Sequence, residues 1–358
     1  MPKIIFRAKS LLTKPSETTE QGVSVVTKQR LPRLKRASSE FLPGFSLTQR
    51  DIAIVEAVSE YRALTAEHIE TLFFPQSVVQ GRRQTNSNCQ TRLRQLYHRG
   101  LLLRKEYPTA IGEPRKPLVY WLDRAGAALL ATTRGIEFSE VGWRPGRQKV
   151  GLQFLAHLLD TNTVRVHVVR SAQAHGFFVS EWRSEDMLRK AHAADRVTIV
   201  TPQGTRQEAT VIPDSYFVLT IPTVGAEPLR YPCFVEIDRR TVTGQASEWS
   251  HGQHDWAKKI LTYLAYIRSG KYAARYGTRQ GRILTATIGE RRLANLKAIT
   301  EESGGKARFW FTTIARIKAG DILTDPLWWV ATRNTIHALV ETRNDKPPGL
   351  AAKVSEKR

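Results

Sequence analysis

The chain has 358 residues, of which 41% are hydrophobic and 25% charged, which is enough for two packed domains. Its formal net charge of +22 favours a polyanionic partner, with nucleic acid ahead of an anionic membrane, and its two cysteines exclude a disulfide framework and fit a reducing cytoplasm. No apolar stretch reaches the roughly 18 residues that span a bilayer, and Arg7 and Lys9 interrupt the apolar N-terminus, so we expect neither a membrane segment nor a signal peptide.

Residues 1–45 are expected to form a flexible basic arm. They are rich in Ser, Thr, Lys and Arg, and the stretch "KQRLPRLKRASS" is followed by the first nearby acid, Glu40. Two interpretations stay open for this segment. It is a solvated tail, or it adds contacts to DNA phosphates.

Residues 46–138 predict a winged helix-turn-helix domain. In "SLTQRDIAIVEAVSEY", Thr48 and Asp51 are spaced as an N-terminal cap, and apolar residues then recur at helical spacing. The segments "TAEHIETLFF" and "TNSNCQTRLRQLYHRG" predict two more helices, the last one ended by Gly100. The segments "LLLRKEY" and "PLVYWLD", separated by a polar loop, predict a hairpin. Three helices followed by a hairpin are typical of a winged helix.

The charge of this domain indicates double-stranded DNA as its partner, because no acidic residue occurs between Glu70 and Glu106. The polar face of the third helix supplies side chains for base edges and phosphates, and the tip of the wing supplies two cations. The candidate DNA-binding residues are Ser87, Thr91, Arg92, Arg94, Gln95, His98, Arg115 and Lys116. The alternative is a winged helix that contacts only other proteins.

A linker at residues 139–151, marked by Pro and Gly, precedes a second domain at residues 152–335, and residues 336–358 are expected to be a tail. Helical and extended patterns in the second domain follow in the order α-β-β-β-α-β, which predicts a mixed α/β fold. Within it, Asp214 is expected on one strand, and Glu236 and Asp238 on the next strand point to the same face. Three converging carboxylates would repel one another unless a cation lay between them.

This order of elements and acids resembles the restriction-endonuclease-like PD-(D/E)xK fold. The chain is similar, over about residues 46–332, to the replication-relaxation family of plasmids and mobile elements, which pairs a winged helix with such a domain. The segments that carry this resemblance include "RLRQLYHRGLL", "LAHLLDTNTVRVHV", "EWRSEDMLR", "PDSYFVL", "FVEIDRRT" and "LTYLAYIRSGKY".

The resemblance implies that Asp214, Glu236 and Asp238 are metal ligands, with Glu185 as an additional acid and Mg²⁺ or Mn²⁺ as the ion. The family's strict motif has Lys at position 238, where this chain has Asp. Lys258 or Lys259 on the following helix, or Arg239 or Arg240, is expected to supply the missing cation, and we take Lys258 as the catalytic candidate.

We therefore expect a cytoplasmic DNA-binding protein of a plasmid or integrative element that acts in replication, relaxation or mobilisation, beside other proteins of those processes. If it is catalytic, it is a Mg²⁺-dependent nickase. The absent motif lysine keeps open a non-enzymatic DNA-binding regulator on an inactive nuclease-like scaffold. An RNA-binding protein fits the charge, but it explains neither the wing nor the carboxylates.

Overall fold

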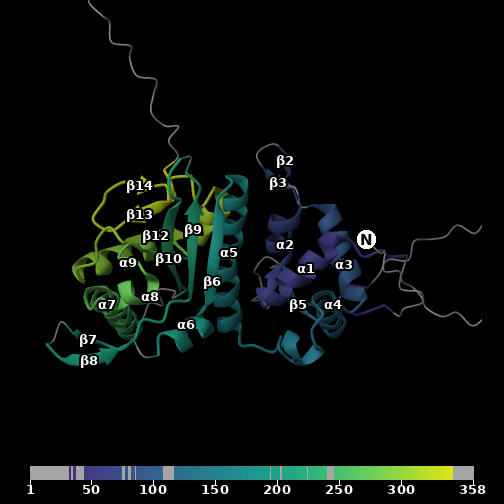
Figure 1. Ribbon diagram of the computed structural model, residues 1–358, viewed down its shortest axis with the longest axis horizontal. Coiled ribbons are helices and arrows are strands. Elements are labelled where there is room, and N and C mark those ends of the chain that lie inside the picture. The colour runs from purple at the N-terminus through teal and green to yellow at the C-terminus, as the bar shows by residue number, and fades with distance from the viewer. Residues whose placement is uncertain are drawn as a thin grey trace, which may run out of the picture. The chain divides into compact units, whose positions relative to one another are not determined.

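The computed structural model of the protein describes residues 32–33, 35–37, 44–74, 77–79, 82–84, 86–107, 117–193, 195–201, 204–223, 225–239 and 246–341, with the backbone alone at residues 77–79, 82–84 and 246–255. The chain divides into two compact units, Met1–Leu152 and Gln153–Arg358, called unit 1 and unit 2 below (Figure 1). The predicted wing-tip cations Arg115 and Lys116, and Arg240, lie outside the described residues.

Unit 1 combines helices with a small antiparallel sheet. Its elements are α1 (Gln49–Glu60), β1 (Leu64–Thr65), α2 (Ala66–Phe73), β2 (Ser77–Val79), β3 (Arg82–Gln84), α3 (Ser87–His98), β4 (Leu102–Glu106), β5 (Leu118–Leu122), α4 (Arg124–Arg134) and the 3₁₀ turn η2 (Phe138–Val141). The sheet has the order β1-β5-β4. The three predicted helices and the predicted hairpin are confirmed, whereas the small β2–β3 hairpin between α2 and α3 was not predicted.

Local signals explain where these helices begin and end. Helix α1 starts at a capping box, in which the Asp51 amide donates to the Thr48 hydroxyl and the Thr48 amide donates to the Asp51 carboxylate at 2.8 Å. Helix α3 is followed by Gly100, whose φ of 72° is a left-handed conformation that favours glycine. The caps expected from the sequence are therefore present.

Unit 2 is built on a seven-stranded mixed sheet with the order β14-β13-β12-β11-β10-β9-β6. Strands β10, β11 and β12 are parallel, and β6, β9, β13 and β14 pair antiparallel with their neighbours. Its elements are α5 (Leu152–Ala174), β6 (Phe178–Ser184), α6 (Glu185–Ala191), β7 (Val197–Val200), β8 (Arg206–Ala209), β9 (Ser215–Ile221), β10 (Leu229–Asp238), α7 (Ala246–Arg268), α8 (Lys271–Tyr276), β11 (Arg282–Thr287), α9 (Glu290–Glu302), β12 (Phe309–Thr313), α10 (Ile314–Ala319), β13 (Trp328–Val330) and β14 (Ile336–His337). The predicted mixed α/β fold is thereby confirmed.

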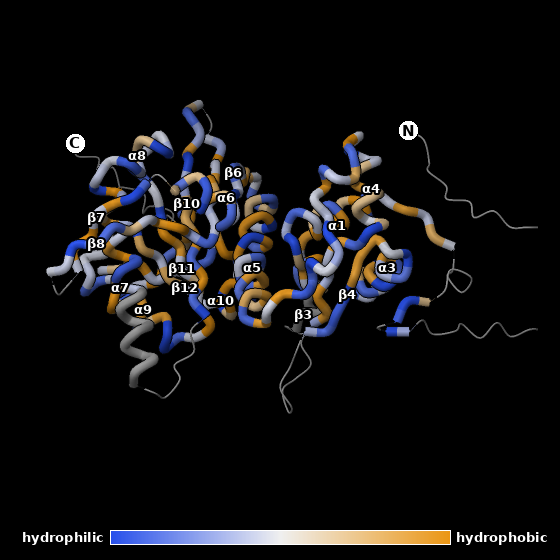
Figure 2. Tube along the Cα trace, turned by 90° about the horizontal axis from the view of Figure 1, so that it is seen from below, coloured by the Kyte–Doolittle hydropathy of each residue, from blue (hydrophilic) through white to orange (hydrophobic). Residues whose placement is uncertain are grey.

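Helices cover both faces of this sheet (Figure 1). On one face, α7, α8 and α9 pack on residues such as Phe234 and Phe309, and on the other face α5 and α10 pack on residues such as Val235 and Leu284. The central strands carry much of the hydrophobic colour in Figure 2. Because side chains alternate along β10, Glu236 and Asp238 share the face of Phe234, toward α7 and α9.

Three predicted boundaries differ from the structure. Asp214, expected on a strand, lies instead between β8 and β9, because Pro213 has no amide for a strand ladder and residues 210–214 belong to neither strand. The second domain does not end at residue 335, since β14 pairs with β13 through His337 and Trp328. Part of the expected linker packs on unit 1, where the Trp143 ring donates to the Leu122 carbonyl at 3.2 Å.

Candidate functional site

Asp214 lies directly before β9, at the end of the sheet where β10 finishes. Its amide donates to the Val235 carbonyl at 3.1 Å, and its Oδ2 accepts from the Ile237 amide at 2.6 Å. Both contacts tie the residue to β10 even though it is not part of a strand. The second contact fixes Oδ2, while Oδ1 faces His157.

Glu236 is buried on β10, where its carboxylate is 1% exposed and is held by two residues of α7. The Lys259 ammonium pairs with Oε2, and the Tyr263 hydroxyl donates to Oε1 at 2.5 Å. Burial raises the pKa of Glu236 to about 7, with a further contribution from the charge of Asp214, against the opposing effect of Lys259. Burial lowers the pKa of Lys259, but the charges of Glu236 and Asp214 more than offset this and leave it raised. Lys259 is therefore a cation held at the buried end of the sheet.

Asp238 has a different partner, although it lies two residues after Glu236 on the same face. Arg292, in the first turn of α9, donates to its two carboxylate oxygens at 2.8 and 2.9 Å. Both side chains of this pair are more than nine-tenths buried. Glu236 and Asp238 therefore pair with residues of different helices, Glu236 with Lys259 of α7 and Asp238 with Arg292 of α9.

A second group of ligand atoms gathers around Asp214. His157 of α5, Glu185 at the start of α6 and Asp214 each place one such atom within 4.8 Å of the other two. The His157 Nε2 lies 3.3 Å from the Asp214 Oδ1. The hydrogen bond that His157 donates to Asp214 raises the pKa of His157 against the effect of burial. Burial raises the pKa of Asp214, but the contacts with His157 and Lys259 lower it by more, so the carboxylate is ionised.

Two other predicted cations differ from Lys259 in exposure or in partner. Lys258, the predicted catalytic lysine, is exposed, and its neighbour Lys259 is the one that meets Glu236. Arg239 pairs with Asp160 of α5. Of the predicted metal ligands, the structure brings together Asp214 and Glu185, while Glu236 lies beside them with Lys259 and Asp238 is held by Arg292.

In unit 1, the predicted DNA-binding residues of α3 separate into two sets. Ser87 and Thr91 are exposed and Arg94 is half-buried, so these three belong to the outer face of the helix. Asn88 and Gln90, which were not predicted, are exposed on the same helix. This outer face carries amide, hydroxyl and guanidinium groups and no acid.

The other predicted residues of α3 serve the fold of unit 1. Arg92 donates to Asp51 at 3.0 Å and to Gln95 at 3.1 Å, so it ties α3 to the start of α1. His98 is buried, and its Nδ1 accepts from the Ala37 amide at 3.1 Å. The expectation that His98 meets bases is therefore corrected, because the end of α3 points it into the interior.

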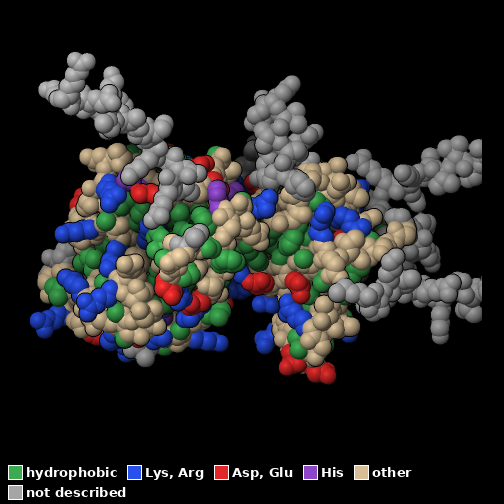
Figure 3. Space-filling model, turned by 45° about the horizontal axis from the view of Figure 1, so that its top comes forward, with side chains coloured by type: hydrophobic (Ala, Val, Ile, Leu, Met, Phe, Trp, Pro, Cys, Tyr) green, Lys and Arg blue, Asp and Glu red, His purple; other side chains and the backbone are tan. Residues whose placement is uncertain are grey.

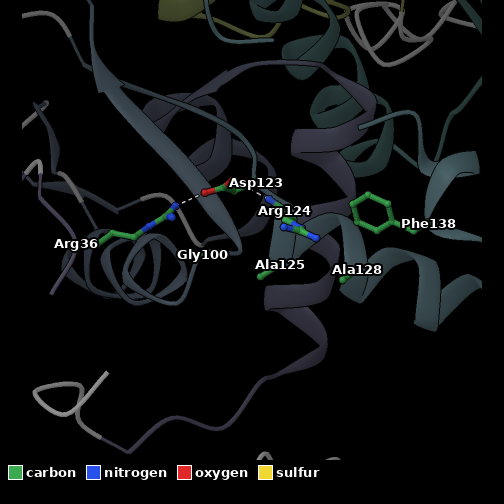
Figure 4. A pocket seen from close by; sticks show the side chains of 7 residues that line it. All are labelled: Arg36, Gly100, Asp123, Arg124, Ala125, Ala128 and Phe138. Carbon is green, nitrogen blue, oxygen red and sulfur yellow. Dashed lines mark hydrogen bonds and ion pairs between the residues drawn. The ribbon is translucent and has the colours of Figure 1, made fainter. Parts of the chain in front are cut away.

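A short piece of the predicted arm docks on unit 1. Arg36 donates to the carbonyls of Tyr97 and Leu102 at 3.0 and 3.2 Å and pairs with Asp123. Figure 4 shows Arg36 and Asp123 meeting beside a pocket of about 510 Å³ at the start of α4. The pocket is lined by Arg36, Gly100, Asp123, Arg124, Ala125, Ala128 and Phe138. Residues 35–37 are thus attached, although the arm was expected to be free.

The surface is strongly basic, as the composition requires. Lys and Arg side chains lie scattered across the visible face of both units (Figure 3). Among the described helices, none combines the length and the apolar character that a bilayer crossing needs.

The fold and the site define a two-unit α/β protein whose larger unit buries a carboxylate–lysine pair beside a histidine–carboxylate group. Residues 55–281, more than half of the chain, match the family model described as replication-relaxation. The chain therefore belongs to the replication-relaxation family, as the sequence resemblance implied, and this membership indicates a role in the replication or relaxation of a plasmid or mobile element. Comparisons with curated proteins and with solved structures gave no match.

Two residues of the site, His157 and Tyr263, were not among the predicted ligands and catalytic groups, and Lys259 was predicted only as an alternative to Lys258. A helical signal distinguishes Lys259 from Lys258, since half-buried Lys259 follows buried Trp256 by three residues and precedes buried Tyr263 by four, on the same side of α7. No such helical signal distinguishes His157, because its partners Glu185 and Asp214 come from distant segments.

Proposed function

We propose that unit 2 is a metal-dependent nuclease that nicks one strand of DNA, and that unit 1 brings it to its site on double-stranded DNA. The observation that carries this proposal is the pairing of buried Glu236 with Lys259 immediately beside Asp214. A cation next to acids at the end of a mixed sheet is what phosphodiester cleavage needs, because negative charge grows on the phosphate in the transition state.

The proposal assigns the nuclease-like arrangement to α5, β6, β9, β10, α7 and β11, in which the element order is similar to the PD-(D/E)xK fold. Asp238 occupies the position of the motif lysine and is held by Arg292. Lys259 reaches the neighbouring acid Glu236 from α7 instead. We assign the role of the motif lysine to Lys259, since an ammonium group beside these acids can stabilise the phosphate whether a strand or a helix carries it.

The roles of the residues follow from their contacts. Asp214 and Glu185 would hold a divalent cation, which supplies a Lewis acid for the phosphate and lowers the pKa of a bound water. Lys259 is charged, and it therefore donates to the attacking oxygen or to the phosphate and does not act as a base. Glu236 and Tyr263 fix the position of Lys259 and of the end of β10.

For unit 1 we propose a winged helix in which α3 enters the major groove and the β4–β5 hairpin is the wing. The support is the order of α1, α2, α3 and the hairpin, and the acid-free outer face of α3 with Ser87, Thr91 and Arg94. Contacts of these groups with base edges and phosphates give both sequence preference and salt-sensitive affinity.

Relaxation of a supercoiled plasmid tests the proposed function. The plasmid carries the origin of the element that encodes the protein, and the wild type is compared with Asp214→Asn, which keeps an acceptor for the Ile237 amide but loses the charge. Asp186→Asn, next to Glu185 but outside the ligand group, is the matched control. We expect nicked circles that require a divalent ion, are lost in Asp214→Asn and persist in Asp186→Asn, with equal DNA binding by all three proteins.

A non-enzymatic regulator is the second candidate, and the Asp238–Arg292 pair at the motif-lysine position favours it. This alternative predicts tight, salt-sensitive binding to the same DNA and an intact supercoiled plasmid with every divalent ion. That pair of results would replace the nuclease with a DNA-binding protein that keeps only the scaffold.

A further inference from the structure

The histidine–carboxylate group of unit 2 has a donor set that the carboxylates of the sequence motif do not suggest. His157 comes from α5, Glu185 from the first residue of α6 and Asp214 from the segment before β9. One ligand atom of each lies within 4.8 Å of the others. Because three separated segments supply the atoms, the tertiary fold and not a local turn brings them together.

One separation in this group is close to that between neighbouring ligands of a metal ion. Ligands about 2.1 Å from an octahedral ion lie about 3 Å apart when they are adjacent and about 4.2 Å apart when they are opposite. The His157 Nε2 and the Asp214 Oδ1 are 3.3 Å apart, which is close to the adjacent case. The Ile237 amide holds the other oxygen of Asp214 at 2.6 Å, so Oδ1 is the atom left for the ion.

The chemistry of the donors decides which ion fits. Mg²⁺ prefers oxygen ligands and gives up its waters reluctantly, whereas imidazole nitrogen binds first-row transition metals more strongly. We propose that His157, Glu185 and Asp214 form a site for a divalent transition-metal ion such as Mn²⁺, and that His157 makes the site prefer this class over Mg²⁺. The inference deepens the proposed nuclease function and rests on it only for the use of the ion in cleavage.

One contact competes with the ion. Arg189, one helical turn after Glu185, forms an ion pair with the Glu185 carboxylate. The Arg189 side chain is 59% exposed, and exposed ion pairs of this kind contribute little free energy. A divalent ion can therefore displace the guanidinium from Glu185 at small cost.

The chain supplies a matched control for His157. His175, in the turn directly after the same helix, places its Nε2 3.2 Å from the Asp321 Oδ2, so it forms a histidine–aspartate contact of nearly the same length. Among the described residues, His175 and Asp321 belong to no group of three ligand atoms. A variant at this second pair reports the loss of a histidine–aspartate contact without the loss of a metal ligand.

The test measures Mn²⁺ binding to the full-length protein without DNA, using the electron paramagnetic resonance signal of free Mn²⁺ as the readout. Mg²⁺ is then added as a competitor. The proteins are the wild type, His157→Gln, which offers an oxygen in place of the nitrogen, and His175→Gln. We expect one Mn²⁺ per chain in the wild type and in His175→Gln, with Mg²⁺ a much poorer competitor. In His157→Gln, Mn²⁺ affinity should fall at least about tenfold and the preference over Mg²⁺ should shrink.

The inference is overturned if the wild type binds no Mn²⁺, if Mg²⁺ competes equally, or if His157→Gln keeps the wild-type preference. Thermal unfolding without metal shows whether His157→Gln is folded, and Glu185→Gln provides a second variant at a more exposed ligand. Failure of the metal-site proposal can be distinguished from failure of the proposed nuclease function. Mn²⁺ bound without any nicking removes only the nuclease, and nicking with an unchanged metal preference in His157→Gln removes only this inference.

Discussion

Arg292 donates two hydrogen bonds to the carboxylate of Asp238, at 2.8 and 2.9 Å, and the two residues join the end of β10 to the start of α9. This contact separates Asp238 from the group around Asp214. Because both side chains of this bidentate pair are more than nine-tenths buried, its loss should change the free energy of unfolding.

Asp238→Ala should destabilise the protein strongly, because it leaves the Arg292 guanidinium buried without its carboxylate. Breaking a buried pair in this way costs about 3–5 kcal/mol. The double variant Asp238→Leu/Arg292→Met should be considerably more stable than Asp238→Ala, since neither charge remains in the interior. Urea unfolding of the single and double variants measures both effects. A single variant as stable as the wild type would show that the pair contributes nothing to the fold.

The fold of unit 2 could be predicted from sequence because its strands and helices carry strong local patterns. The hydrophobic run around Phe234 correctly predicted the strand that carries Glu236 and Asp238. The break before β9 was not predicted, since the effect of Pro213 depends on the strand that lies beside it. The β2–β3 hairpin was missed because its short strands contain Arg82 and Arg83 in place of an apolar alternation.

The candidate site could be predicted only in part. Period-2 alternation correctly placed Glu236 and Asp238 on one face, but alternation does not tell which helix covers each residue. In the structure α7 brings Lys259 to the first and α9 brings Arg292 to the second. Such partners are set by tertiary packing between segments that lie far apart in the chain.

Helix α3 should show a clear division between recognition and stability. Arg94→Ala should weaken DNA binding by about 1–3 kcal/mol and reduce its salt dependence, because Arg94 lies on the outer face of the helix. Its melting temperature should stay close to that of the wild type. Fluorescence anisotropy at several salt concentrations, with thermal unfolding, measures both quantities.

Arg92→Ala is the matched variant, two residues away on the same helix. It should lower the melting temperature, because Asp51 is fully buried and loses the guanidinium that pairs with it. The account of α3 would be contradicted if Arg94→Ala unfolded the protein while Arg92→Ala reduced only its affinity for DNA.

The buried His192 should make unit 2 sensitive to acid. Its Nδ1 lies 2.8 Å from the Val211 carbonyl, so this nitrogen carries the proton, and its Nε2 accepts from the Tyr276 hydroxyl at 2.6 Å. Burial lowers the pKa of His192, with further lowering by Arg275 and Arg183, against the raising effects of the Val211 carbonyl and Asp195. The folded protein therefore holds this imidazole neutral.

A histidine with a lowered folded pKa contributes full stability above the ordinary pKa of 6.5, and that contribution is lost as the pH falls through the folded pKa. Wild-type stability should therefore decrease more steeply between pH 7 and 5 than that of His192→Gln, which keeps polar groups but cannot titrate. Denaturant unfolding across this pH range gives both slopes. Parallel slopes would mean that His192 does not couple to folding.

Lys259 and Lys258 give the most direct test of the central claim, that the lysine of α7 paired with buried Glu236 serves a nuclease site in unit 2. The two residues are adjacent and carry the same charge, but only Lys259 meets Glu236. Relaxation of the supercoiled plasmid is measured with Mn²⁺ at saturating plasmid, so that a change in affinity for DNA does not enter the rate. Lys259→Met should lower the nicking rate by about 10²-fold or more, and Lys258→Met should leave it unchanged. Nicking by Lys259→Met at the wild-type rate would contradict the account.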